Sequence, residues 1–216
     1  MTLVMADDSL DETQRLLDRA GQGDRRALNE LFDRYRGRLK RAIQLRLNPR
    51  LASRVDDSDV LQEAYLEVSR HLAEYLREPA MPFYLWLRHI AMQKLVAAHR
   101  THLGAQMRDA AREVSLQAGA GLRASTASLA ARLVGRLTSP SQAAMRAELR
   151  AQLEDALNRM NEIDREVLVL RHFEQLSNAE TAQVLGIQES AASKRYLRAL
   201  ERLHQILTEM RILDDG

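Results

Sequence analysis

The sequence SNAETAQVLGIQESAASKRYLRALER, from Ser177 to Arg202, carries the strongest local signal for the fold of this chain. It predicts a short helix from Ala179 to Leu185, a turn at Gly186-Ile187-Gln188, and a second helix with basic residues early on its surface. Gly186 suits a left-handed turn, because glycine adopts positive φ without a steric penalty. This order is the pattern of a helix-turn-helix, whose second helix enters the major groove of DNA. The side chains expected near bases or phosphates are Ser190, Ser193, Lys194, Arg195 and Arg198.

The same pattern has a plainer interpretation, which is an ordinary helical hairpin with a solvated basic face. DNA binding is favoured because three residue types coincide at the required offsets. Gly186 allows the turn, Ala182 permits close crossing of the two helices, and Ile187 fills the space between them.

Composition agrees with a wholly helical protein. Leu, Ala, Arg, Glu and Gln dominate the 216 residues, and these residues favour helices. Aromatic residues are only 4% and prolines only four, which argues against a β-sandwich or barrel. Because the chain has no cysteine, a disulfide scaffold, a cysteine-based zinc site and a thiol nucleophile are excluded. No apolar run approaches about 18 residues and the acidic start is no signal peptide, so we expect a cytoplasmic protein with no membrane insertion.

Three parts separate by composition along the chain. Residues 8–103 and residues 145–210 show helical periodicity. Residues 104–144 are rich in Ala, Ser, Gly and Thr, which indicates a flexible tether. A short docked helix within the tether is permitted by leucines at every fourth position, namely Leu129, Leu133 and Leu137. The sequence therefore predicts an all-α fold of two small helical domains joined by a linker.

Charge is arranged in blocks, although the net charge is only +2. Residues 34–54 hold eight basic residues and no acid, whereas residues 56–67 hold five acids and no base. Such blocks indicate separate surfaces for separate partners, at least one of them polyanionic. The acids fall on the outer face of one expected helix, where a solvated or protein-docking face is favoured over a catalytic site.

The stretch PFYLWLRHIAMQKLVAAHR, residues 82–100, mixes aromatic and basic side chains. Rings stack on bases and cations hold phosphates, so the mixture suits single-stranded or melted DNA. The alternative, favoured for Trp86, is that the aromatic side chains are simply core. His99 and His102 have a metal-ligand spacing, but no cysteine or convergent carboxylate supports a metal. The candidate DNA contacts are Arg88, Gln93, Lys94, His99 and Arg100.

Catalytic signatures are absent from the sequence. It has no nucleotide-binding glycine loop after a strand, no HEXXH motif and no GXSXG motif. We therefore expect neither an enzyme nor a cofactor.

With these segments in order, the chain resembles the bacterial sigma-70 family of RNA polymerase sigma factors, in its extracytoplasmic-function (ECF) type. DDSDVLQEAY, from Asp56 to Tyr65, is similar to the family motif DAEDLVQETF, and FYLWLRHIA, from Phe83 to Ala91, is similar to FRAWLYRIA. Residues Asp164 to Leu203 are similar to region 4 of the family. Each motif is degenerate, but their order and spacing over nearly the whole chain are specific.

The resemblance implies a function and partners. Residues 8–103 would be region 2, which binds core RNA polymerase and recognises and melts the −10 element of promoter DNA. Residues 145–210 would be region 4, which reads the −35 element. An anti-sigma factor or a regulatory kinase would control the protein, and catalysis would belong to the polymerase. The residues that would bind polymerase are Asp59, Leu61, Gln62, Glu63 and Tyr65.

The sequence departs from the family pattern at a few positions. Gln93 and Ala97 stand where Asn and Asp are frequent, which puts the promoter-melting preference in doubt. Ser58 replaces a frequent acid, so a phosphate there would restore negative charge, although Ser58 as a plain helix cap is favoured.

Two other functions compete with the sigma-factor hypothesis. A stand-alone helix-turn-helix regulator would need a ligand or phosphoacceptor domain upstream, and residues 8–103 lack the alternating strands of one. A helical adaptor that only contacts proteins would leave the helix-turn-helix spacing unexplained.

Overall fold

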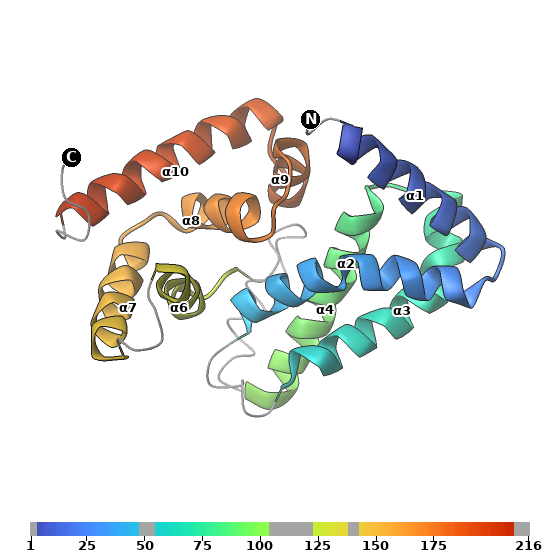
Figure 1. Cartoon of the computed structure of the whole chain (residues 1–216), viewed down its shortest axis with the longest axis horizontal. Coiled ribbons are helices and arrows are strands. Elements are labelled where there is room, and N and C mark those ends of the chain that lie inside the picture. Colours follow the sequence, from blue (N-terminus) through green and yellow to red (C-terminus); the bar gives the residue numbers. More distant parts are fainter. Residues whose placement is uncertain (1–3, 48–54, 104–122, 138–142, 210–216) are drawn as a thin grey trace.

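The computed structural model describes residues 4–47, 55–103, 123–137 and 143–209. Its first helices are α1 (Val4–Gly21), α2 (Arg25–Arg46), α3 (Asp57–Arg77) and α4 (Phe83–Leu103). The later ones are α6 (Thr126–Leu137), α7 (Ala143–Asn158), α8 (Glu162–Leu168), α9 (Asn178–Leu185) and α10 (Glu189–Glu209), with a π-helical turn over Val169–Phe173. These four ranges contain no strand, which confirms the predicted all-α fold. Figure 1 shows two halves, with α1–α4 on one side and α6–α10 on the other.

The N-terminal half encloses one apolar core. Leu31, Leu39 and Ile43 follow helical spacing along α2 and are fully buried. The break expected at Pro79 and Pro82 is confirmed, since α3 ends at Arg77 and α4 begins at Phe83. A proline lacks the backbone N–H and restrains the residue before it, so a helix could not continue through this segment.

The C-terminal half has its own core, which includes part of the predicted linker. Helix α6 lies within residues 104–144 and packs along α7. Its buried Leu129 and half-buried Leu133 contribute to this core, as the leucine spacing permits. Residues 104–122 lie outside the described ranges, and the domain boundaries stay predictions.

The predicted turn of the helix-turn-helix is confirmed. Gly186 follows α9 in the left-handed conformation, with φ 64° and ψ 34°. Its N–H donates to the carbonyl oxygens of Ala182 and Gln183, and the N–H of Ile187 donates to the Ala182 oxygen at 3.0 Å. These bonds satisfy carbonyls that the end of a helix leaves unpaired and so direct the chain into α10.

Replacing Gly186 by alanine is expected to lower the free energy of unfolding by about 1–2 kcal/mol. A Cβ at this position would meet no atom within 4 Å, so the loss comes from the left-handed backbone alone. Gly135→Ala is the matched control, because Gly135 is exposed within α6 with open space around it, and alanine there should stabilise by about 0.5–1 kcal/mol. Urea unfolding measures both, and a change of the same sign in the two variants would contradict the assigned turn.

Candidate functional site

Helix α10 turns its predicted DNA-contacting side to solvent. Ala199 and Ile206 lie on its opposite side, fully buried in the C-terminal core. This burial fixes the rotation of α10 about its axis, so that the start of the helix projects an exposed polar and basic surface. Four of the five predicted residues lie on this surface: Ser190, Ser193, Lys194 and Arg198. A helix of this kind, exposed along one side and preceded by a tight turn, can enter the major groove.

The fifth predicted residue, Arg195, is half buried and has a partner within the protein. Its Nη1 donates to Oδ1 of Asp164 on α8 at 3.4 Å. Arg195 therefore helps to hold α10 against α8. Sequence reasoning missed Leu197, whose 56% exposure places an apolar side chain beside Lys194 and Arg198. An apolar side chain at such a position can contact the methyl group of thymine.

A hydrogen bond connects helix α9 to the start of α10. Ser177 caps α9, since its Oγ accepts from the N–H of Glu180 and its own N–H donates to Oε2 of Glu180 at 2.7 Å. Nδ2 of Asn178 donates to the carbonyl oxygen of Glu189, the first residue of α10, at 2.9 Å. These bonds orient the second helix before any partner binds.

The predicted polymerase-binding residues of α3 divide into an exposed and a buried group. Asp59, Gln62 and Glu63 are exposed, whereas Leu61 is 2% exposed and belongs to the N-terminal core. Tyr65 is half buried, and its hydroxyl donates to Oδ1 of Asn29 on α2 at 2.5 Å. The surface open to a protein partner is therefore mainly polar and acidic, and it also includes Leu66, which is 47% exposed.

A groove of about 370 Å³ lies beside this acidic surface, between α2 and α3. Gln62 and Tyr65 line it from α3, and Phe32 and Arg36 line it from α2. The ring of Tyr65 meets that of Phe32 edge to face, with centroids 5.2 Å apart. Because the two rings pack on each other, the groove is rigid, and a side chain of a partner protein can enter it.

Ser58 lies in the first turn of α3, and the cap of this helix is Asp56. The side chain of Asp56 accepts from the N–H of Ser58 at 2.9 Å, so the capping role expected for Ser58 is wrong. That hydrogen bond also lowers the pKa of Asp56. Ser58 is exposed, and its hydroxyl approaches Oδ1 of Asp57 at 3.4 Å.

The predicted DNA contacts of α4 lie on different sides of the helix. Gln93 and Arg100 lie on an exposed side, whereas Arg88 and His99 are each 5% exposed. Burial also lowers the pKa of His99. Lys94 is half buried, and its Nζ donates to Oε2 of Glu67 on α3 at 2.7 Å. This hydrogen bond holds the pKa of Glu67 below its ordinary value.

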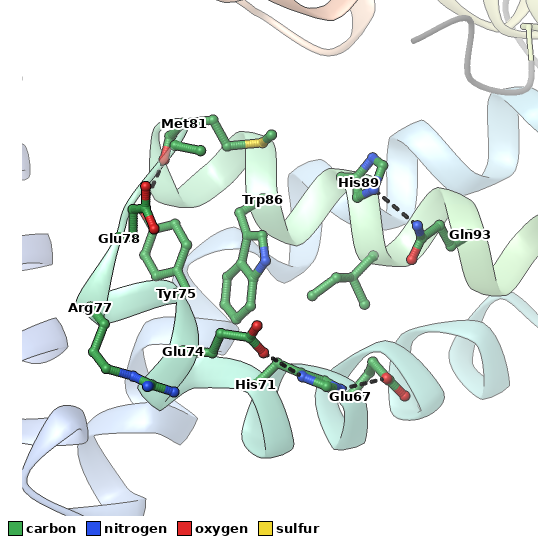
Figure 2. A pocket seen from close by; sticks show the side chains of 12 residues that line it. Glu67, His71, Glu74, Tyr75, Arg77, Glu78, Met81, Trp86, His89 and Gln93 are labelled. Atoms are coloured by element: carbon green, nitrogen blue, oxygen red, sulfur yellow. Dashed lines mark hydrogen bonds and ion pairs between the residues drawn. The ribbon is translucent and has the colours of Figure 1, made fainter. Parts of the chain in front are cut away.

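A pocket that sequence reasoning missed opens beside the exposed side of α4 (Figure 2). It measures about 620 Å³ and lies between the end of α3 and the first turns of α4. The rings of Trp86 and Tyr75 stack in its wall, with centroids 4.4 Å apart and an angle of 16° between their planes. The hydroxyl of Tyr75 donates to the carbonyl oxygen of Met81, which fixes the loop between the helices. The sequence signal that could have indicated this pocket is an aromatic residue, Tyr75, at the end of the helix that precedes the PFYLW segment.

The rim of the pocket is polar and carries both signs of charge. His89 and Gln93 lie at one side within hydrogen-bond distance of each other, at 2.9 Å. His71 lies on the other side between two carboxylates, 3.0 Å from Glu67 and 3.2 Å from Glu74. Such a pocket offers an aromatic wall for stacking and hydrogen-bonding groups for the edges of a flat ring.

Charged side chains also meet where the two halves of the protein join. Arg46 of α2 pairs with Glu166 of α8 and, at 2.5 Å, with Glu174 of the turn before α9. Arg88 of α4 holds Glu174 by two bonds, from Nε at 2.6 Å and from Nη2 at 3.3 Å. We call these four residues the interdomain charge cluster. Sequence reasoning missed it, apart from Arg88, because its members are dispersed along the chain.

Burial and pairing shift the pKa values within this cluster in opposite directions. Burial by itself would raise the pKa of Glu174, but Arg46 and Arg88 lower it to about 2. Burial would likewise lower the pKa of Arg46, but Glu166 and Glu174 raise it. Glu174 and Arg46 therefore both stay ionised throughout the neutral pH range.

Neither a metal site nor a membrane-spanning helix is found within the described ranges. No group of three His, Asp or Glu side chains there is placed to hold a metal ion. No helix in those ranges is long and apolar enough to span a bilayer.

An exposed basic helix that follows a tight turn in an all-helical protein defines a DNA-binding protein of the helix-turn-helix class. Residues 150–203 match the family model "Sigma-70, region 4". ECF RNA polymerase sigma factor SigD of Mycobacterium tuberculosis is 30% identical over 181 residues, which cover 84% of this chain and 77% of that protein. ECF RNA polymerase sigma factor BldN of Streptomyces coelicolor is 26% identical over 204 residues, covering 94% and 69%.

A solved structure shows the same fold. CnrH, in complex with the cytosolic domain of CnrY, has a TM-score of 0.56 at 24% identity, covering 92% of this chain and 99% of that one. The chain belongs to the ECF family of RNA polymerase sigma factors. It binds core RNA polymerase and directs promoter-specific initiation, and a stand-alone regulator is not favoured.

Proposed function

We propose that three surfaces of the protein have separate roles in transcription initiation. Helix α10 reads the −35 element, α4 with the pocket beside it receives the −10 element, and the exposed face of α3 docks on core RNA polymerase. The observation that carries the proposal is the exposed start of α10, held in a fixed rotation by Ala199 and Ile206. Residues 8–103 act as region 2, residues 145–210 as region 4, and residues 104–144 as the linker.

The location and control of the protein follow from this role. The polymerase and the chromosome are cytoplasmic, so we place the protein in the cytoplasm, with catalysis left to the polymerase. An anti-sigma factor or a kinase remains the expected controlling partner.

Reconstituted transcription tests the proposed function. Purified protein, core polymerase and genomic promoter fragments should give discrete run-off transcripts that neither protein produces alone. A stand-alone regulator would instead bind its DNA site equally well without polymerase. Specific DNA binding that core polymerase leaves unchanged, with no transcript, would overturn the proposal.

The pocket of region 2 suits an unstacked base of the melted −10 strand. The wall formed by Trp86 and Tyr75 offers a face for stacking, which contributes about 1–3 kcal/mol per base. The three acids around it, Glu67, Glu74 and Glu78, outnumber the one arginine, Arg77, so they disfavour a phosphate inside the pocket but can accept from an exocyclic amino group of a base. The base therefore enters the pocket while its phosphate stays outside.

Replacing His89 and Gln93 together by alanine is expected to reduce open-complex formation about fivefold or more. Both side chains are exposed, so the fold should not change, and one lost hydrogen bond to the base corresponds to about 1 kcal/mol. Permanganate reactivity of unpaired thymines measures the opening, with core-polymerase affinity measured in parallel. Thr101→Ala is the matched control, because Thr101 is exposed on the same helix and its hydroxyl donates to the backbone oxygen of Ala97, one turn earlier. Equal opening by the double variant and the control would remove the pocket from −10 recognition.

A further inference from the structure

The interdomain charge cluster fastens regions 2 and 4 to each other in the free protein. The side chains of Arg46 and Glu174 are 0% exposed, that of Arg88 6% and that of Glu166 9%. Oε2 of Glu166 also accepts from the N–H of Ala124, the residue that leads into α6, at 3.1 Å. All the cations come from region 2 and all the carboxylates from region 4, so every ion pair of the cluster crosses between the halves.

Apolar and backbone contacts surround the cluster. Leu170 and Leu176 of the C-terminal half belong to the N-terminal core, and Leu45 of α2 belongs to the C-terminal core. Arg38 of α2 donates from Nε and Nη2 to the carbonyl oxygens of Glu174 and Gln175, both at 3.3 Å. The contact is therefore continuous and excludes water from the four charges.

A buried ion cluster of this kind holds two surfaces in one arrangement without binding them strongly. The charges recover their hydration when the halves separate, so the free energy of pairing is largely offset. Removal of one partner acts differently, because it leaves an opposite charge buried and unpaired. The cluster thus specifies a closed arrangement that a competing ligand can open.

Arg88 is the member whose pairing matters for function. Its guanidinium donates to the carboxylate of Glu174 through Nε and Nη2. This is the bidentate geometry with which arginine also binds a phosphate. While Glu174 fills this position, Arg88 cannot contact a DNA backbone.

We propose that Glu174 occupies, in the free protein, the position that a DNA phosphate takes at Arg88. The closed arrangement thereby withholds Arg88 from the −10 strand until the halves separate. This inference rests on the proposed role of α4 in −10 recognition. Glu174 of region 4 would thus be an intramolecular competitor that reduces the binding of DNA by the free protein.

Fluorescence energy transfer between the halves tests the closed arrangement. The chain has no cysteine, so Ser69→Cys on α3 and Glu201→Cys on α10, both exposed positions, accept a dye pair. Glu174→Gln should lower the transfer efficiency while helix content by circular dichroism stays native. Glu162→Gln is the control, because it removes the same charge from region 4 at an exposed glutamate, which pairs with the half-buried Arg123. If Glu174→Gln loses helix content, Arg38→Ala replaces it as the opening variant, because it removes two bonds to backbone oxygens and a cation–π contact with Tyr84 but leaves the four charges of the cluster in place.

Binding of a labelled oligothymidylate tests the masking of Arg88. Glu174→Gln should bind this single strand about fivefold or more tightly than the Glu162→Gln control, since apparent affinity rises with the fraction in the open state. Adding Arg88→Ala to Glu174→Gln should cancel the gain. Unchanged energy transfer, or a gain that persists without Arg88, would overturn the inference. Run-off transcription by the wild-type protein separates this result from a failure of the proposed function itself.

Discussion

Reversal of two charges on α3, as Asp59→Arg with Glu63→Arg, is expected to weaken binding of core RNA polymerase about a hundredfold. Both carboxylates are exposed, so the substitutions should leave the fold unchanged, although Asp59 lies in the first turn of α3 and its reversal costs about 0.5–1 kcal/mol through the helix dipole. Close charge pairs across an interface are worth a few kcal/mol, and each 1.4 kcal/mol or so changes an equilibrium constant tenfold. Fluorescence anisotropy of labelled protein titrated with core polymerase measures the affinity.

The control for this experiment carries the same change of charge on another helix of the same half. Asp11 and Asp18 are exposed on α1, so Asp11→Arg with Asp18→Arg should bind core polymerase as the wild type does. Rising salt should narrow the difference between the two double variants, because exposed charges are screened. Wild-type affinity in the α3 variant would exclude this face of α3 from polymerase docking.

Removal of Lys194 and Arg198 together is expected to abolish transcription that depends on the −35 element. Both side chains are exposed at the start of α10, and a lost base contact costs roughly 1–3 kcal/mol. A contact to a base and a contact to a phosphate have different signatures. Loss of a base contact relaxes the sequence preference. Loss of a phosphate contact lowers the affinity for all sequences alike and reduces the slope of the logarithm of the binding constant against the logarithm of salt concentration by about one. Single variants assayed on mutated −35 sequences at several salt concentrations assign each residue to one role.

Arg202→Ala is the matched control on α10. Arg202 is exposed two turns beyond Lys194, and its Nη1 donates to Oε1 of Gln205 at 3.0 Å. Transcription should be close to that of the wild type in this variant. Transcription that survives in Lys194→Ala with Arg198→Ala would mean that α10 does not read the promoter.

The helix-turn-helix could be predicted because its determinants are local. Gly186 sets the turn through its own backbone freedom, and the residues that cross or cap α9 lie within a few positions of it. The break between α3 and α4 was equally local, since prolines act on their own and the preceding residue. Predictions of this kind need no knowledge of distant neighbours.

The candidate contacts on α4 could be predicted only in part. Helix α4 packs against α2 and α3, and only a narrow stripe that includes His89, Gln93 and Arg100 is exposed. Residue type indicated that the segment was basic and aromatic, but not which side of it faced solvent. Arg88 therefore resembled an exposed DNA contact in the sequence, although it is buried beside Glu174.

The helical class, the turn at Gly186 and the family could all be predicted from the sequence, since periodicity, capping and motif order are read over short spans. The pairing of Arg46 with Glu166, 120 positions apart, and of Arg88 with Glu174, 86 positions apart, became visible only in the folded protein. A buried charge is tolerated only beside an opposite charge. That partner is supplied by the docking of the two halves, which no local pattern in the chain encodes.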